Sequence, residues 1–243
     1  MPEGAIAVTG SSRGIGAAIA IELAARGFTV ACLSRAGGLP DKAPAGGKFV
    51  CARCDVTDEA SMRDAFAQVV KDAGSLKGLV NNAGVHRESD SSALATADFE
   101  DLMRTNATSV MMVSREAYPH LKAAGGGRIV NIGSFFDRIG VARNLAYCAS
   151  KAAVGAITRC LATEWARDGI TVMNVAPGYI LTDLNRDTLT EEKFLRWLKG
   201  RSPAGRPGTP EEVARLVGSL YSEDNAFLTG ETIYVDGGQA MAL

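Results

Sequence analysis

The chain has 243 residues, 47% of them hydrophobic, and a formal net charge of −1 at pH 7. This length suits one α/β domain with a large core, and we expect residues 1–243 to form a single domain. Basic residues are spread along the whole chain, which argues against a nucleic-acid-binding or anionic-lipid-binding protein. Small molecules and further copies of the chain are the expected partners.

The sequence has no feature of a secreted or membrane-spanning protein. Its five cysteines are an odd number in a chain too long to need disulfide staples, which is typical of a reduced intracellular protein. The N-terminus leads almost directly into an apolar run at 5–8, without a basic region, a cleavage site or a run of spanning length. We therefore expect a cytoplasmic protein.

Short apolar runs alternate with stretches of helical periodicity. The runs cover 5–8, 29–33, 49–51, 78–80, 128–132, 171–175 and 232–235. Such alternation is typical of an α/β fold with a parallel sheet. We expect a doubly wound Rossmann fold with about seven parallel strands and helices on both faces.

The segments between the runs differ in character. Ile15, Ile19 and Leu23 repeat at helical spacing, and the stretches 98–123 and 147–167 are long enough for helices of five or more turns. In contrast, 36–47 carries too much glycine and proline for a helix, so we expect a surface loop there. The proline- and glycine-containing stretch 202–210 predicts a turn between elements.

A glycine-rich turn directly follows the first predicted strand. It reads Thr9-Gly10-Ser11-Ser12-Arg13-Gly14-Ile15-Gly16 and runs into a helix with an apolar face. Glycines allow close backbone approach, and the free N–H groups of a helix N-terminus attract phosphate. Although an ordinary strand-to-helix connection looks similar, this position in an α/β pattern favours a dinucleotide site at Gly10, Ser12, Arg13, Gly14, Ile15 and Gly16.

The second predicted strand ends in Leu33-Ser34-Arg35. Dinucleotide folds that bind NAD usually place a carboxylate there to receive the ribose 2′-hydroxyl. With Arg35, Ser34 and Arg13 in its place, the sequence favours a 2′-phosphate and therefore NADP(H), with NAD(H) as the alternative. Taken singly, each arginine would be read as a solvated surface charge.

Several further motifs follow in a characteristic order. They are Asn81-Asn82-Ala83-Gly84, Ser134, Tyr147 with Lys151 four residues later, and Pro177-Gly178 with Thr182. Together with the glycine turn, they resemble the short-chain dehydrogenase/reductases over residues 9–238. The resemblance implies an oxidoreductase that moves a hydride between a nicotinamide cofactor and a carbonyl or alcohol carbon.

The residues themselves suggest the proton chemistry. Tyr147 and Lys151 would lie one turn apart on one helix face. A nearby ammonium favours the phenolate, so we expect Lys151 to lower the pKa of Tyr147 and allow proton exchange near neutral pH. Ser134 follows the strand at 128–132, at the sheet edge where such folds bind ligands, and could hydrogen-bond the substrate oxygen.

Other roles come only from the resemblance. It implies that Lys151 also contacts the nicotinamide ribose and that Asn106 takes part in a water-linked proton relay. It implies cofactor contacts by Asp55, Val56, Asn82, Ala83, Gly84, Tyr147, Pro177, Gly178, Ile180 and Thr182. It also implies a homo-oligomer, a tetramer or dimer, built on the long central helices and the last strand.

The substrate is the least defined part of the site. The C-terminal third is similar to the 3-oxoacyl-[acyl-carrier-protein] reductase branch, but Phe135-Phe136-Asp137 is bulkier and more charged than the small residues of that branch. We expect Ser134, Phe135, Phe136, Asp137, Tyr147 and Tyr179 to border the substrate, together with the loop segment 181–201. A 3-oxoacyl reductase or general ketone reductase, an NAD-dependent alcohol, sugar or steroid dehydrogenase, and a non-catalytic nucleotide sensor all stay open.

The cysteine spacing and the two histidines can be mistaken for a metal or redox site, but the details of the sequence argue against one. Cys51 and Cys54 have the spacing of a zinc or redox pair, but residues three apart on a strand point to opposite faces. His86 and His120 lack ligand spacing. We expect no metal site.

Overall fold

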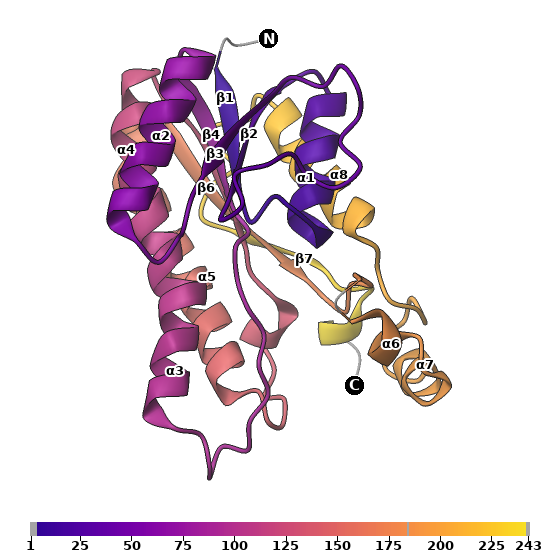
Figure 1. Ribbon diagram of the computed structural model, residues 1–243. Helices are drawn as coiled ribbons and strands as arrows, with labels where there is room; N and C mark the ends of the chain where they lie inside the picture. The colour runs from indigo at the N-terminus through magenta and orange to yellow at the C-terminus, as the bar shows by residue number, and fades with distance from the viewer. Residues whose placement is uncertain (1–3, 184, 242–243) are drawn as a thin grey trace.

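The computed structural model describes residues 4–183 and 185–241, which are built around one seven-stranded sheet with every neighbouring pair parallel (Figure 1). The strands are β1 Ala5–Thr9, β2 Thr29–Ser34, β3 Phe49–Arg53, β4 Leu76–Asn81, β5 Gly127–Ile132, β6 Ile170–Pro177 and β7 Thr232–Val235. Their order is β3-β2-β1-β4-β5-β6-β7. The chain therefore reverses its winding between β1 and β4, which confirms the expected doubly wound fold.

Helices cover both faces of the sheet (Figure 1). α1 Gly14–Ala25 and α8 Pro210–Ser222 lie side by side on one face. On the other face lie α2 Glu59–Ala73, α4 Ser109–Ala123 and α5 Leu145–Trp165. No helix within 4–183 and 185–241 has both the length and the apolar character needed to cross a membrane.

Alternate residues along the strands pack into two separate hydrophobic cores, one on each face of the sheet. In β1, Ala5 and Ala7 pack with the α2, α4 and α5 layer, whereas Ile6 and Val8 pack with α1 and α8. Both sets are nearly fully buried, as expected for a parallel strand with both faces covered. This burial explains why the strands could be recognised as continuous apolar runs.

A ladder of polar side chains crosses the core on the α4 and α5 face. Asn81 of β4 donates hydrogen bonds to Ser114 at 2.9 Å and to Asn131 of β5 at 2.8 Å. Asn131 in turn donates to the Thr158 hydroxyl of α5 at 2.9 Å. Because every member is buried and paired, the ladder fixes α4 and α5 against the carboxyl halves of β4 and β5.

The predicted helix at 98–123 contains an irregular turn. α3 Thr96–Met103 continues through a π-helical turn, Arg104–Thr108, into α4. The π turn carries Asn106, which is 1% exposed. The spacing of apolar residues in the sequence does not reveal a single inserted residue of this kind. Such π turns are frequent at functional sites.

The remaining connections agree with the sequence in part. Residues 36–47 form no helix, as expected, and their backbone is tied to the glycine turn by the Asp41 N–H to the Ser12 carbonyl at 3.0 Å. The turn ending at Pro210 is also present, with Thr209 capping α8. However, the segment 181–201, which we expected to be a loop, contains the helices α6 Arg186–Leu189 and α7 Glu192–Lys199. These helices are so short that the spacing of their apolar residues does not show a helical period in the sequence.

Candidate active site

The glycine turn lies at the carboxyl end of β1 and is held by Asn82. Gly10 and Gly14 have positive φ values of 63° and 59°, which favour glycine. Asn82 donates from its amide to the carbonyl oxygens of Thr9 at 3.0 Å and Gly10 at 3.2 Å. A Cβ on Gly16 would collide with the Gly10 carbonyl oxygen and the Asn82 amide, so no larger residue fits there.

The first turn of α1 has the donor groups that a pyrophosphate needs. Its N-cap residue, Arg13, makes no side-chain capping hydrogen bond, and the turn contains no acidic residue. A Cβ on Gly14 would meet only a methyl group of Thr182, 3.8 Å away, so the backbone there is open to a ligand. Ser12 and Ile15 flank it, both half-buried. These residues fit a bound dinucleotide.

The ends of β2 and β3 gather positive charge. Ser34 is paired in register with Arg53, and Arg35 follows it at the surface. The charges of Arg35 and Arg53 help to lower the pKa of Asp55, after the larger contribution of the hydrogen bonds from Thr57. Arg35 and Arg53 therefore both lie near Asp55, at the strand end where the sequence predicted contacts to the ribose 2′-phosphate.

Asp55 is also a turn residue. Its carboxylate accepts from the N–H of Thr57 at 2.9 Å and from the Thr57 hydroxyl at 2.7 Å. Val56, beside it, is half-buried. These contacts shape the chain after β3 and both use the same carboxylate oxygen of Asp55, Oδ1.

A second group of expected cofactor contacts follows β4 and β6. The N–H groups of Asn82 and Ala83 donate to the Thr9 hydroxyl at 3.0 and 3.1 Å, which joins the end of β4 to the glycine turn. Gly84 lies next in the chain and faces the Asn106 side chain. The chain after β4 is thereby held against both β1 and the π turn.

After β6, the segment at 177–182 folds back toward the glycine turn. Gly178, which follows Pro177, donates its N–H to the Val235 carbonyl at 2.9 Å, and Ile180 is 6% exposed. Asn185 closes a small turn by accepting from the N–H of Thr182 at 2.8 Å. The turn brings Thr182 next to Gly14, as noted above.

Tyr147 and Lys151 lie on α5, and their side chains meet. The Lys151 nitrogen is 5.7 Å from the centre of the Tyr147 ring and donates a hydrogen bond to the Ile132 carbonyl at 2.8 Å. Lys151 is only 6% exposed. The helical spacing therefore brings the phenol and the ammonium to the end of β5, as the sequence predicted.

Ser134 lies at the same strand end, two residues beyond Ile132. Its hydroxyl oxygen accepts from the Phe136 N–H at 3.3 Å, and Ser134 also hydrogen-bonds the Tyr147 phenol, an interaction that lowers the pKa of Tyr147. Ser134 is thus a cap for the short 3-10 turn Phe135–Asp137 as well as a neighbour of Tyr147. A hydrogen bond that lowers the pKa of a phenol is donated to its oxygen, so the Ser134 hydroxyl proton faces the Tyr147 phenol.

The pKa values of the pair differ from the sequence-based expectation. Burial raises the pKa of Tyr147 to about 12, which outweighs the effect of the Ser134 hydrogen bond. Burial also lowers the pKa of Lys151 to about 8. The pKa of Tyr147 is therefore raised overall, whereas the sequence predicted that it would be lowered, because sequence spacing carries no measure of desolvation.

Asn106 lies between the chain after β4 and helix α5. Its side-chain oxygen accepts from the Val85 N–H at 2.8 Å, and its amide donates to the Val85 carbonyl at 2.8 Å and to the Ser150 hydroxyl at 3.3 Å. The π turn supplies the displacement that directs this buried amide toward Val85 and Ser150. Asn106 therefore joins the two segments that carry Gly84 and Tyr147.

Aromatic side chains form one wall of the site. Phe136 contacts both Tyr147 and Tyr179, with ring centres 5.8 and 6.0 Å apart, and Tyr179 also contacts Phe194 and Trp197 of α7 at 5.2 and 5.8 Å. The expected substrate residues Ser134, Phe136, Tyr147 and Tyr179 are therefore brought together.

Phe135 and Asp137, which the sequence also placed at the substrate border, have other partners. Phe135 is 2% exposed and packs on Tyr179 at 5.3 Å between ring centres, so it supports the wall from behind. Asp137 accepts from the Tyr234 hydroxyl of β7 at 3.0 Å, and burial raises its pKa. Its contact is thus with the last strand.

The sequence analysis did not identify two residues that lie near the site. Arg53 belongs to the positive cluster through strand pairing, which no local pattern shows. His86 contacts the Tyr147 ring with 4.7 Å between ring centres, and its Nε2 lies 2.6 Å from Oδ1 of Asn144. The position of His86 could have indicated its role, because it lies two residues after the Asn81-to-Gly84 motif, beyond the carboxyl end of a strand, where such sheets bind ligands.

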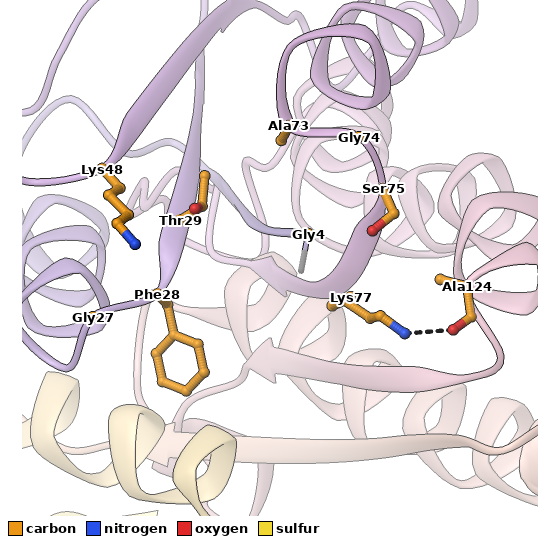
Figure 2. A pocket seen from close by; sticks show the side chains of 10 residues that line it. All are labelled: Gly4, Gly27, Phe28, Thr29, Lys48, Ala73, Gly74, Ser75, Lys77 and Ala124. Carbon is orange, nitrogen blue, oxygen red and sulfur yellow. Dashed lines mark hydrogen bonds between the residues drawn. The ribbon is translucent and has the colours of Figure 1, made fainter. Parts of the chain in front are cut away.

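A hollow of about 1010 Å³ lies at the opposite, amino end of the strands. Figure 2 shows it lined by residues that include Gly4, Phe28, Lys48 and Lys77, with the Lys77 ammonium bound to the Ala124 carbonyl. It adjoins Gly4, the first described residue, and contains none of the motif residues. Its size does not make it the candidate site, because ligands of open α/β sheets bind at the carboxyl ends of strands.

No group of three or more histidine, cysteine or acidic side chains with metal-binding geometry occurs within 4–183 and 185–241. Cys51 lies in register with Cys32 on the neighbouring strand, and all five cysteines are free thiols. Burial raises the pKa of both Cys32 and Cys54 to about 12. These buried thiols are poor nucleophiles at neutral pH.

Comparisons with known proteins point in one direction. Residues 10–240 match the family model described as Enoyl-(Acyl carrier protein) reductase. The chain is 36% identical over 241 residues to gluconate 5-dehydrogenase of Gluconobacter oxydans, in an alignment that covers 97% of this chain and 94% of that protein. It is 37% identical over 244 residues to the 3-oxoacyl-[acyl-carrier-protein] reductase of Escherichia coli, which covers 98% of each.

Solved structures agree with the sequence matches. A gluconate 5-dehydrogenase from Burkholderia cenocepacia, in complex with NADP and tartrate, is similar with a TM-score of 0.91 and 33% identity, covering 100% of this chain and 97% of that one. A short-chain alcohol dehydrogenase structure from Sinorhizobium meliloti gives a TM-score of 0.93 at 30% identity, covering 100% of this chain and 98% of that one. All four relatives match nearly end to end.

Proposed function

The chain belongs to the short-chain dehydrogenase/reductase family, and we propose that it is an NADP(H)-dependent carbonyl reductase. As a member of that family it is an oxidoreductase that moves a hydride between a nicotinamide cofactor and a carbonyl or alcohol carbon. The observation that carries the proposal is the convergence of Ser134, Tyr147 and Lys151 at the carboxyl end of β5. We also propose that residues 1–243 work as one domain, since one sheet runs through the described part.

Tyr147 is the proposed proton donor. In reduction, the substrate oxygen gains a proton as its carbon gains a hydride, and a phenol with a raised pKa keeps its proton until that oxygen becomes basic. Ser134, which lies beside the phenol, donates a hydrogen bond to the same oxygen, keeps its own proton and holds that oxygen in place. The bound nicotinamide supplies the hydride in this direction and accepts it in the reverse.

Lys151 and Asn106 are proposed to support this step. The Lys151 ammonium, close to the Tyr147 ring, stabilises the phenolate left after proton transfer and is positioned to bind a ribose hydroxyl. Asn106 holds the segments on either side of the phenol, and we propose that it also takes part in the relay that returns the proton. Lys151 thus stabilises charge, and Asn106 maintains position.

The proposed cofactor contacts extend from the glycine turn to the segment after β6. Gly10, Ser12, Arg13, Gly14, Ile15 and Gly16 would hold the pyrophosphate and adjoining ribose, and Ser34, Arg35 and Arg53 the 2′-phosphate. Asp55, Val56, Asn82, Ala83 and Gly84 would border the adenosine, and Pro177, Gly178, Ile180 and Thr182 the carboxamide. The positive cluster at the ends of β2 and β3 and the NADP bound to the Burkholderia relative support the preference for NADP(H).

The substrate is proposed as a small carbonyl compound, a 3-oxoacyl derivative or a general ketone. The name of the Escherichia coli relative favours an acyl thioester, and that of the Gluconobacter relative favours a hydroxy acid. The aromatic wall formed by Phe136 and Tyr179 gives an apolar side to the site, with α7 over it.

A homo-oligomer in the cytoplasm is the proposed working form. Helix α5 leaves a row of small side chains exposed, including Ala152 and Ala156, which would allow a second copy to approach closely. The five free thiols are consistent with a reducing compartment. Equilibrium sedimentation and fractionation of the host cell would test the two statements.

The proposed activity is tested with a panel of ketones, acyl thioesters, diols and sugars, each assayed with NADP(H) and NAD(H) by nicotinamide absorbance. We expect turnover of at least one carbonyl compound, with NADPH preferred over NADH. Tight NADPH binding without turnover of any compound would instead favour a nucleotide sensor.

A further inference from the structure

His86 lies beside the proposed proton donor. Its ring meets that of Tyr147 at 82°, with 4.7 Å between the ring centres. Its Nε2 lies 2.6 Å from Oδ1 of Asn144, a buried residue just before α5. The imidazole is therefore held against the Tyr147 ring by a ring contact and a short hydrogen bond to Asn144.

The backbone on both sides of His86 is also fixed. Val85, the preceding residue, exchanges hydrogen bonds through its N–H and carbonyl with the Asn106 side chain, both at 2.8 Å. Ser89, three residues later, donates its N–H to the Arg143 carbonyl at 2.9 Å. Anchoring at both ends gives His86 the preorganised position that a ligand-binding group requires.

The hydrogen-bond network defines which ring nitrogen is free. The Asn144 amide nitrogen donates to the Ala142 carbonyl at 3.0 Å, so it is Asn144 Oδ1 that faces His86. This oxygen can only accept, and Nε2 of His86 must therefore carry the proton. In the neutral imidazole, Nδ1 is left as a hydrogen-bond acceptor.

The neighbouring charges favour a neutral substrate group over an anionic one. Arg87 is paired with Asp101 at 2.6 Å, and Arg143 lies 3.9 Å from Glu88 and 3.8 Å from Asp90. Glu88 also acts on Tyr179, whose pKa is raised first by burial and then by this negative charge. The arginines next to His86 and Asn144 thus already have acidic partners, and the Glu88 carboxylate adds negative charge near Tyr179.

We propose that His86 is a specificity residue whose Nδ1 accepts a hydrogen bond from a hydroxyl on the carbon next to the reacting carbon. The two rings are in contact, with 4.7 Å between their centres, so a substrate bound at the phenol also lies next to the imidazole. The substrate class is then the α-hydroxy ketones and the corresponding vicinal diols. This inference rests on the proposed reductase function.

Acetoin and butanone test the inference, since they differ by one hydroxyl on the carbon next to the ketone. The readout is the ratio of their kcat/KM values with NADPH, in the wild type and in three variants. His86→Phe keeps a ring against Tyr147 but removes both nitrogens. His86→Asn keeps an acceptor near the position of Nδ1, whereas His86→Gln keeps only a group near the position of Nε2.

We expect the wild type to prefer acetoin and His86→Phe to lower the acetoin-to-butanone ratio by roughly 5- to 10-fold, the size of one neutral hydrogen bond, mainly through KM for acetoin. His86→Asn should restore most of the ratio and His86→Gln should not. The control is His120→Phe, at the other histidine, which contacts Phe66 and should leave the ratio unchanged. Thermal midpoints and NADPH binding check that each variant is folded.

A fall of equal size for both ketones in His86→Phe would overturn the inference, since it would mean a purely structural role. Equal kcat/KM for the two ketones in the wild type would overturn it as well, and so would a preference for 2-oxo acids that is lost with His86. In each case, the proposed reductase function would stand. Failure of the wild type to reduce any compound of the wider panel would instead remove the function on which the inference rests.

Discussion

The Lys151 ammonium donates a hydrogen bond to the carbonyl oxygen of Ile132, 2.8 Å away. This bond links helix α5 to the last residue of β5, two positions before Ser134. The distance between the proposed proton donor and the strand end is therefore set by a buried charge as well as by apolar packing. A loss of that charge should be felt in both chemistry and cofactor binding.

Replacement of Tyr147 by phenylalanine should lower kcat for a good carbonyl substrate by roughly 10²- to 10⁴-fold, the usual contribution of a positioned acid. The ring contacts with Phe136 and His86 would remain. NADPH binding, followed by the quenching of protein fluorescence, should change little. Unaltered turnover in Tyr147→Phe would show that another group transfers the proton.

The pH dependence should report Lys151. Its pKa is lowered from the ordinary 10.5 to about 8 by burial, so the ammonium is present below this pH and is lost as the pH rises through it. We expect kcat/KM for NADPH to fall above pH 8, where the neutral amine binds a ribose hydroxyl and a phenolate less strongly. Stopped-flow or steady-state rates between pH 6 and 10 measure the profile.

Lys151→Arg provides the control for this profile, because a guanidinium keeps its charge over the whole range. The variant should have a lower kcat/KM at every pH, since the planar guanidinium group does not match the single hydrogen bond to the Ile132 carbonyl. Its pH profile should lack the decline near pH 8. Identical declines in the two proteins would assign the titration to a different group.

Arg35→Asp should shift the cofactor preference toward NADH. A charged hydrogen bond contributes about 1.5–3 kcal/mol, so the NADPH-to-NADH ratio of kcat/KM should fall by roughly 10- to 100-fold. Arg53→Ala should lower the same ratio less, since it removes one charge from the cluster without adding a negative one. Arg63→Ala, at a surface arginine of α2, is a control with an unchanged ratio. An unchanged ratio in Arg35→Asp would place the 2′-phosphate elsewhere.

Asn131→Ala should destabilise the protein because it breaks the polar ladder across the core. It would leave the Asn81 amide and the Thr158 hydroxyl each without one partner, at a cost of roughly 2–4 kcal/mol. Urea unfolding followed by circular dichroism, at one fixed protein concentration, measures it. Ser219→Ala, at a surface hydroxyl of α8, should cost far less. Equal midpoints for the two variants would argue that the ladder adds no stability.

The sequence predicted the strands and the sheet type because a parallel sheet covered on both faces needs continuous apolar runs. It also brought Ser134, Tyr147 and Lys151 together correctly, because helical spacing and strand ends are local features. In contrast, the π turn at Asn106, the pairing of Arg53 with Ser34 and the approach of His86 to Tyr147 depend on tertiary packing. The raised pKa of Tyr147 was mispredicted for the same reason, since desolvation is a property of the folded site.

The connection between β2 and β3 has no helix to pack on the sheet, and only Pro40 is buried among residues 35–47. Insertions or deletions in that stretch would therefore leave the interior intact while they alter the surroundings of the proposed adenosine site. Ser34 and Arg53, by comparison, are fixed by strand pairing. The fold thus separates a stretch that can change length without repacking from strand ends whose residues are fixed, so a change of coenzyme would need no rebuilding of the proposed hydride-transfer site.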